Sequence, residues 1–189
     1  MTEALFTIPS PEPDPVLLPV APGQLVDTDQ GPFGLATAVF DPTRVYRFRL
    51  SRVWDPQLPR VNFLMLNPST ADAFKLDRTV RRCVDFAKLW GAGALEVTNA
   101  FALRSPYPKD LALVADPVGP GNDEAIAAAA LSADTVVVAW GVHAKERGLY
   151  VATMLKDLGV DVLALHLTKN GCPGHPLYIP AAAIPVPYN

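Results

Sequence analysis

Polar and aromatic side chains follow four short apolar runs of this sequence, at the points where strands would end. In chain order they are Asn67, Pro68 and Ser69 after the first run, Asn99 and Phe101 after the second, residues 141–143 after the third, and His175 and Tyr178 after the fourth. The carboxyl ends of parallel strands meet at one edge of a sheet, and ligands of open α/β sheets bind beyond that edge. We therefore expect these side chains to share one pocket.

Two asparagines carry most of this expectation. Taken singly, Asn67 or Asn99 is best explained as a cap of a strand end or turn, because asparagine bonds readily to nearby backbone. Two amides at one sheet edge favour a ligand site instead, since an amide offers both a donor and an acceptor to a planar ligand. Ser69 has the same two interpretations, a ligand contact or a turn.

The remaining candidates have structural alternatives as well. Phe101 and Tyr178 could stack on a planar ligand, although aromatic residues near strand ends more often pack against the core. His175 lies in a loop between a glycine and a proline, where a functional role is more natural than for His166, which ends a strand, or for His143, which opens a helix. His175 is therefore the histidine that we assign to the site.

Two arginines stand near the beginning of a predicted helix. Backbone N–H groups at a helix start suit a phosphate, and the cationic side chains of Arg81 and Arg82 would strengthen such a site. A solvated helix face with ion pairs explains both residues equally well. We predict phosphate contacts at Arg81 and Arg82, with this alternative open.

The sequence contains no evident metal or cofactor motif. Cys172 and His175 have a spacing compatible with metal ligation, but further ligands are missing, and Cys83 is the only other cysteine. Motifs of nucleoside triphosphate, dinucleotide, zinc-protease and serine-hydrolase sites are absent too. We therefore expect no metal and no cofactor.

The elements that would position these side chains are those of an α/β fold. Short apolar runs alternate with helical stretches from Val61 onward, which is typical of parallel strands joined by crossover helices. The expected strands are 62–66, 94–98, 135–140 and 160–166, and the expected helices are 79–90, 123–131 (with Asn122 or Asp123 as N-cap) and 144–158. This pattern predicts a three-layer sandwich around a central, mainly parallel four-stranded sheet.

The N-terminal part differs from this pattern. Residues 1–34 are rich in proline and predict an extended arm, and residues 35–189 are expected to form a single α/β domain. At its beginning, residues 35–40 and 45–51 predict an N-terminal β-hairpin. Tyr46, Phe48 and Leu50 alternate there with Arg47 and Arg49, so one face should pack and the other should be basic.

Composition limits the classes of protein that this chain can be. With 189 residues, 50% of them hydrophobic and 19% charged, it is typical of a globular domain. The net charge of −3 gives no general attraction to nucleic acid, so a polyanion would need a local basic patch. No apolar run is long enough to span a membrane and no secretory leader is evident. We expect a cytoplasmic protein without a membrane partner; the sequence does not determine its oligomeric state.

Five motifs make the chain similar to a known family. They are LMLNPSTAD, DRTVRRC, EVTNAFALRSPYPKDL, VVVAWGVHA and LTKNGCPGHPLY, in this order. Over about Tyr46 to Pro180 the chain resembles a bacterial and phage family catalogued only as a domain of unknown function, number 1643 in that series.

The order of elements also resembles, more distantly, the uracil-DNA glycosylase superfamily. There an Asp-Pro or Asn-Pro motif after the first strand positions the attacking water, and Asn67-Pro68 occupies that place. Asn99 matches the base-reading asparagine and His175-Pro176 the His-Pro loop. The segment 69–72 and Leu177-Tyr178 depart from the pattern. The resemblance implies a uracil-DNA glycosylase-like fold.

Two hypotheses about function follow from this resemblance. The first is an N-glycosidic hydrolase acting on a nucleobase in DNA or in a nucleotide, in which Asn67 holds water, Asn99 reads the base, Phe101 stacks on it and His175 stabilises the departing base. The second is a non-catalytic module that binds a nucleobase, a nucleotide or nucleic acid, which the absence of a carboxylate at position 67 favours. Release of a base from a test substrate would separate the two.

Overall fold

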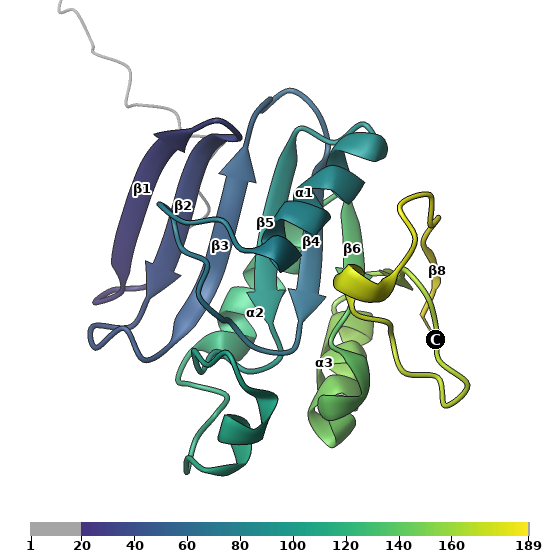
Figure 1. The fold of residues 1–189 in the computed structure, drawn as a ribbon. Helices are drawn as coiled ribbons and strands as arrows, with labels where there is room; N and C mark the ends of the chain where they lie inside the picture. The colour runs from purple at the N-terminus through teal and green to yellow at the C-terminus, as the bar shows by residue number, and fades with distance from the viewer. Residues whose placement is uncertain (1–19, 189) are drawn as a thin grey trace, which may run out of the picture.

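The structure is a computed structural model that describes residues 20–188 (Figure 1). Its strands are β1 (Leu25–Gly31), β2 (Gly34–Phe40), β3 (Arg47–Val53), β4 (Arg60–Met65), β5 (Ala94–Asn99), β6 (Thr135–Val138), β7 (Val162–Ala164) and β8 (Val186–Pro187). Its helices are α1 (Arg78–Leu89), α2 (Asn122–Leu131) and α3 (Lys145–Asp157), and three 3₁₀ helices are η1 (Pro108–Ala112), η2 (Gly141–His143) and η3 (Pro176–Tyr178). The first 19 residues of the predicted N-terminal arm lie outside the described part, and β1 falls within the rest of it.

All eight strands of the described chain form one mixed sheet, in the order β1-β2-β3-β5-β4-β6-β7-β8. β4 pairs in parallel with β5 and with β6, and β6 pairs in parallel with β7. The remaining pairs, which involve β1, β2, β3 and β8, are antiparallel. The predicted α/β fold is confirmed. The predicted size of the sheet is wrong, because the sheet has eight strands in the described chain and includes the hairpin that was expected to be separate.

The hairpin is part of the sheet because β5 needs a partner on its second edge. β5 is buried along its whole length, and β3 pairs with it antiparallel, with Leu50 opposite Val97. Without β3, the backbone N–H and C=O groups of a buried strand would lack hydrogen-bond partners, at a cost of about 1–3 kcal/mol for each group. The alternating pattern of β2 and β3 indicates strands but does not identify the strand they pair with.

A β-bulge in β3 changes which way its arginines point. Phe40 of β2 pairs with Arg47 and Val39 pairs with Arg49, so Phe48 is an extra residue in β3. Such a bulge re-aims the side chains beside it. Arg47 donates to the carbonyl of Ala71, whereas Arg49 pairs with the Glu96 carboxylate. The predicted shared basic face of Arg47 and Arg49 is therefore wrong.

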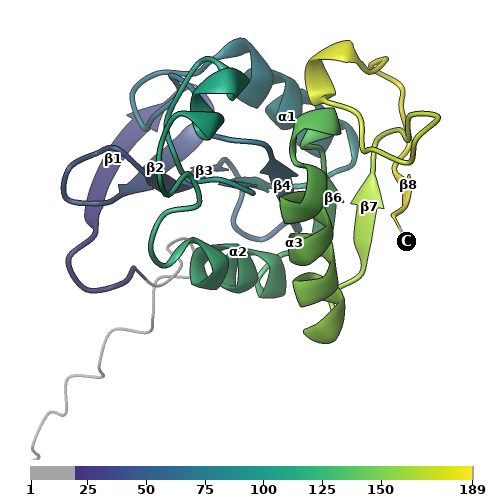
Figure 2. The ribbon, with the colours of Figure 1, turned by 90° about the horizontal axis from the view of Figure 1, so that it is seen from below.

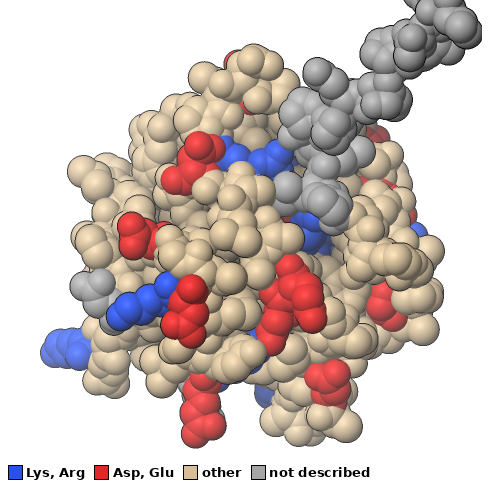
Figure 3. All heavy atoms as spheres, turned by 180° about the vertical axis from the view of Figure 1, so that it is seen from behind, with Lys and Arg blue, Asp and Glu red and all other residues tan. Residues whose placement is uncertain are grey.

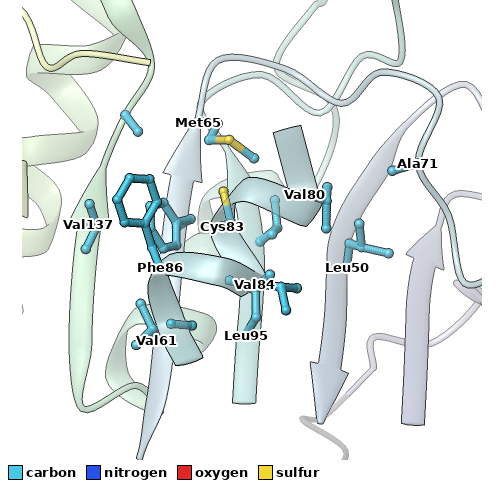
Figure 4. Close-up of a cluster of buried hydrophobic side chains, with 14 of the residues drawn as sticks. Leu50, Val61, Met65, Ala71, Val80, Cys83, Val84, Phe86, Leu95 and Val137 are labelled. Atoms are coloured by element: carbon cyan, nitrogen blue, oxygen red, sulfur yellow. The ribbon is translucent and has the colours of Figure 1, made fainter. Parts of the chain in front are cut away.

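Helices cover both faces of the sheet. α1 lies on one face, and α2 and α3 lie on the other (Figure 2). On the α1 side, the rings of Phe63, Phe86 and Trp90 stack with centroids 5.5–6.4 Å apart. Figure 4 shows Phe86 of α1 directed toward the strands that carry Val61 and Val137. A separate apolar cluster packs α2 and α3 against the opposite face.

The beginning of α2 differs from the sequence-based expectation. The N-cap is Gly121, whose φ of 79° is in the left-handed region that favours glycine, and neither Asn122 nor Asp123 has this role. Asn122 is the first helical residue, and its Nδ2 donates to the carbonyls of Asn99 (3.1 Å) and Ala100 (3.3 Å). This contact joins α2 to the end of β5, which explains why the side chain is unavailable as a cap.

Among residues 20–188, no helix combines the length and the apolar character that crossing a membrane requires.

The aromatic stack predicts how strongly α1 is held on the sheet. Phe86→Ala should lower the free energy of unfolding by about 3–5 kcal/mol, because it removes a buried ring and leaves a cavity. Leu89→Ala is the control on the same helix: Leu89 is 63% exposed, and its loss should change stability by less than about 0.5 kcal/mol. Urea unfolding followed by circular dichroism measures both, and equal losses would show that the stack does not anchor α1.

Candidate functional site

A cavity of about 640 Å³ lies at the carboxyl edge of the parallel strands. Its wall includes residues that directly follow β4, β6 and β7, together with the beginning of α1 and the η3 segment. A volume in this range accommodates a small molecule such as a nucleotide. Of the side chains predicted for the site, the structure places Asn67, Ser69, His175 and Tyr178 in this wall.

The other predicted residues do not line the cavity. Pro68 is buried, and its carbonyl accepts from Ser105 N. Asn99 is 1% exposed, and its Oδ1 accepts a weak hydrogen bond from Nη2 of Arg47 at 3.4 Å. Phe101 packs against the core cluster beneath α2 and α3. A base-reading role of Asn99 and a stacking role of Phe101 remain predictions.

The two predicted phosphate-binding arginines contact other parts of the protein. Arg82 Nη2 donates to the carbonyl of Ile179 at 2.7 Å, and the Arg82 guanidinium lies over the Phe86 ring. The exposed Arg81 places its guanidinium 4.8 Å from the centre of the Phe33 ring. Arg82 thereby anchors η3 to α1, and so holds one wall of the cavity in place.

Asn67 has a fixed orientation at the cavity. Its Nδ2 donates to the carbonyls of Ser105 (2.8 Å), Pro68 (3.1 Å) and Leu103 (3.4 Å). Since carbonyls only accept hydrogen bonds, the NH₂ group must face them, and the amide oxygen Oδ1 must face away. Within the described residues Oδ1 accepts no hydrogen bond. Asn67 therefore offers an acceptor to a ligand or a water.

Backbone hydrogen bonds hold the loop that carries His175 in place. Gly174 N donates to the carbonyl of His166 at 2.8 Å, and Gly141 N donates to that of Pro173 at 3.0 Å. These bonds tie the loop to the ends of β7 and β6. A Cβ on Gly174 would lie 2.8 Å from the terminal methyl group of Ile179, so a larger residue there would require that side chain to move.

The surroundings of His175 favour its neutral form. Burial lowers the pKa of the imidazole below its ordinary value of 6.5, and the nearby charge of Asp77 opposes this only in part. Its Nδ1 accepts from Leu177 N at 3.4 Å, which places the proton of the neutral ring on Nε2. At neutral pH, His175 thus presents an uncharged N–H donor.

Asp77 is a cavity residue that sequence reasoning did not select. Its Oδ1 accepts from Val80 N at 2.8 Å and caps α1. The second carboxylate oxygen accepts no hydrogen bond from the described residues. Asp77 lines the same cavity as Asn67 and His175, which brings a potential proton acceptor to the site. A carboxylate two residues before the predicted helix 79–90 was the available signal, but a cap explains that position equally well.

Arg47 was predicted to lie on a basic face of the hairpin, but it is a cavity residue. It lines the cavity although it is only 2% exposed, because the bulge at Phe48 turns it toward the α1 side. It is the only lysine or arginine among the cavity residues of the described chain. Nothing in the alternation of β3 predicts this orientation.

All three histidines of the chain, His143, His166 and His175, line the cavity. His166, for which a functional role was judged less natural than for His175, is exposed at the cavity. Among residues 20–188, no group of three or more His, Cys, Asp or Glu side chains is arranged to hold a metal ion.

Comparison with known proteins assigns most of the chain to one family. The model of a family described as "Protein of unknown function (DUF1643)" matches residues 47–177. The matched segment runs from β3 to η3 and includes Arg47, Asn67, Asp77 and His175. No curated protein and no solved structure matches the chain.

The three carbonyl contacts of Asn67 predict that it also stabilises the cavity wall. Asn67→Ala should lower the free energy of unfolding by about 1–3 kcal/mol, because it removes the donor that joins the loops after β4 and β5. Ser69→Ala is the control, since no side-chain hydrogen bond of Ser69 occurs within the described residues, and it should cost less than about 0.5 kcal/mol. Urea denaturation of both variants tests this, and a neutral Asn67→Ala would contradict it.

The lowered pKa of His175 predicts a dependence of stability on pH. As the pH falls below about 6.5, the unfolded chain binds a proton at His175 before the folded chain does. Folding stability therefore falls as the pH drops through the lowered pKa of the folded state. His175→Gln removes this contribution and should lose less stability than the wild type between about pH 7 and about pH 5. Urea unfolding at a series of pH values measures the difference. If the free energies of unfolding of the wild type and of His175→Gln changed equally with pH, the imidazole would not be held neutral.

Proposed function

The chain belongs to the DUF1643 family of unknown function, and we propose that it hydrolyses the N-glycosidic bond of a nucleotide-like substrate. The observation that carries the proposal is the convergence of Asn67, Asp77 and His175 on one cavity. They offer an acceptor, a carboxylate and a neutral N–H donor. Hydrolysis of this bond needs three such groups, because water must be positioned, must lose a proton, and must meet a carbon whose leaving group is stabilised.

The proposed reaction uses each group once. Oδ1 of Asn67 holds a water, and the carboxylate of Asp77 accepts its proton as the oxygen attacks the anomeric carbon. The bond between that carbon and the base nitrogen breaks, and its electron pair stays on the base. Nε2–H of His175 donates a hydrogen bond to the base as negative charge develops there. The base finally takes up the proton from Asp77, so that one water is consumed.

The resemblance to the uracil-DNA glycosylase superfamily supports the proposal through the order of its motifs. Asn67-Pro68 and His175-Pro176 follow the first and last parallel strands, as the corresponding motifs do in that superfamily. An asparagine at position 67 can orient water but cannot remove its proton. Asp77 supplies the missing carboxylate from a different segment.

A free nucleotide suits the cavity better than a nucleic acid. Arg47 is the only lysine or arginine among the described cavity residues, whereas a polymer backbone needs several cationic contacts. The face that carries α2 and α3 shows acidic side chains distributed among few basic ones (Figure 3). DNA remains a second substrate to be tested, because base flipping would deliver the same chemical group.

Binding without turnover is the alternative function. It is favoured by the amide at position 67 and by Asn99, which the structure places outside the cavity wall. A chain of this kind would hold a nucleobase or nucleotide tightly and release no base.

Substitution of Asp77 tests the proposal with little disturbance of the fold. Asp77→Asn should reduce the rate of base release from nucleoside 5′-monophosphates by about 10²–10⁴-fold, because the proton acceptor is lost. Asparagine caps helices as well as aspartate does, so the stability should change by less than about 1 kcal/mol. Chromatography of the free base measures the rate, and a parallel assay for abasic sites uses duplexes with uracil, mismatched or oxidised bases.

The control is Asp85→Asn, which makes the same chemical change at an exposed position of α1. It should leave the rate unchanged. Equal rates for Asp77→Asn and the wild type would contradict the assignment of Asp77. Tight binding with no base released from any substrate would establish the binding module instead.

A further inference from the structure

We propose that Arg47, which lines the cavity and has Asn99 packed behind it, forms an anion subsite, and that the substrate therefore carries a phosphate monoester. This inference rests on the proposed function for the identity of the cavity as a substrate site. It adds the class of substrate: a mononucleotide whose phosphate is read at the Arg47 end, while Asn67, Asp77 and His175 act on the glycosidic bond.

The first observation is a buried cation without an ion-pair partner. Arg47 is 2% exposed, and within the described residues no carboxylate lies within salt-bridge distance of it. Arg49, two residues further along β3, is paired as buried charges usually are, since its Nε lies 2.8 Å from the buried carboxylate of Glu96. Buried charges are normally paired, because desolvation of an unpaired ion costs several kcal/mol. An anionic ligand would supply the missing partner of Arg47.

The second observation is a surplus of buried donors at the same place. Arg47 Nε and Asn99 Nδ2 are both buried and have no acceptor in the described structure. The two side chains are neighbours, because Arg47 Nη2 donates to Asn99 Oδ1 at 3.4 Å. Within residues 20–188, the only other acceptor of Arg47 is the carbonyl of Ala71, at 2.6 Å from Nη1. A ligand rich in acceptors, such as a phosphate, matches this arrangement.

The charge of Arg47 persists at the pH of the cell. Burial lowers the pKa of the guanidinium to about 10, which is still well above neutrality, and Asp77 favours the charged form. Asp77 itself lines the cavity and would repel an anion. The beginning of α1 offsets this repulsion, because Val80 N donates to the Asp77 carboxylate and the helix dipole is positive at that end.

The backbone explains why this arginine, and not its neighbours, serves the site. The extra residue at Phe48 turns Arg47 toward the cavity, and pairing with Glu96 holds Arg49. The guanidinium is held by β3 and by the loop that contains Ala71, so it does not need to be ordered when a ligand binds. A fixed cation at one end and the three reactive groups in the same wall suit a molecule with a phosphate and a base.

The test uses ribose 5-phosphate, which has no base and therefore cannot undergo the proposed reaction. Isothermal titration calorimetry of the wild type should show ribose 5-phosphate binding roughly 10- to 100-fold more tightly than ribose, as expected for charge-assisted hydrogen bonds. Arg47→Met should abolish this preference. Equal affinity of the two sugars for the wild type would overturn the subsite.

Asn99→Asp keeps Arg47 and tests the same point if Arg47→Met fails to fold. The new carboxylate would stand where Oδ1 now accepts from Arg47 and would compete with the phosphate for the cation. Affinity for ribose 5-phosphate should fall by at least about tenfold, with a melting temperature at or above that of the wild type. Wild-type affinity in Asn99→Asp would contradict the proposal.

The matched control is Lys88→Ala, which removes one positive charge from an exposed site in the last turn of α1, away from the cavity. It should bind ribose 5-phosphate as the wild type does, and a loss as large as that of Arg47→Met would overturn the assignment to Arg47. The outcomes also separate this inference from the proposed function. Phosphate-dependent binding without release of a base would support the subsite and contradict the proposed hydrolase activity. Release of a base at equal rates from nucleosides and nucleotides would support the hydrolase activity and contradict the subsite.

Discussion

β4 pairs in parallel with β5 on one side and with β6 on the other, and the candidate site depends on this pairing. Met65 lies opposite Asn99, and Leu64 lies opposite Val138, so the three strands end at nearly the same level. The chain must then leave the sheet at one edge, through loops that hydrogen bond to each other. The Asn67 amide joins two of these loops, and the loop before η3 is tied to the ends of β6 and β7.

Buried arginines on β3 show how neighbouring residues with the same chemistry come to serve different purposes. Arg49 pairs with a fully buried carboxylate, which explains it as part of the core. Arg47 lies in the wall of a cavity, and its only acceptors in the described part of the chain are a carbonyl and an amide oxygen. A charge that the fold does not neutralise is costly, and such a cost is usually found at sites that bind or react. The lack of an ion-pair partner at Arg47, more than the number of polar residues, distinguishes the cavity from the rest of the surface.

Much of the architecture could be predicted from local patterns. The three helices and the four parallel strands lie close to their expected ranges, because apolar periodicity reports directly on helices and covered strands. The strand β1 and the attachment of the hairpin to β5 were not predicted, since strand partners are chosen by contacts between distant segments. The same limit applies to Arg82, whose partner is the carbonyl of Ile179, 97 residues further along the chain.

For the site, local patterns were enough to predict that Asn67 and His175 belong to one sheet edge, because both follow strands whose order and direction the apolar runs indicate. The groups that complete the site are brought there by contacts between distant segments. Asp77 reaches the cavity because α1 packs across the sheet with its first turn at that edge, and Arg47 reaches it because a bulge between β2 and β3 reverses its direction. Asn99 was placed at the correct edge, yet the tertiary structure keeps it out of the cavity wall, against Arg47. Side-chain direction at a bulge depends on the pairing of two strands, and this information is absent from the pattern of either strand alone.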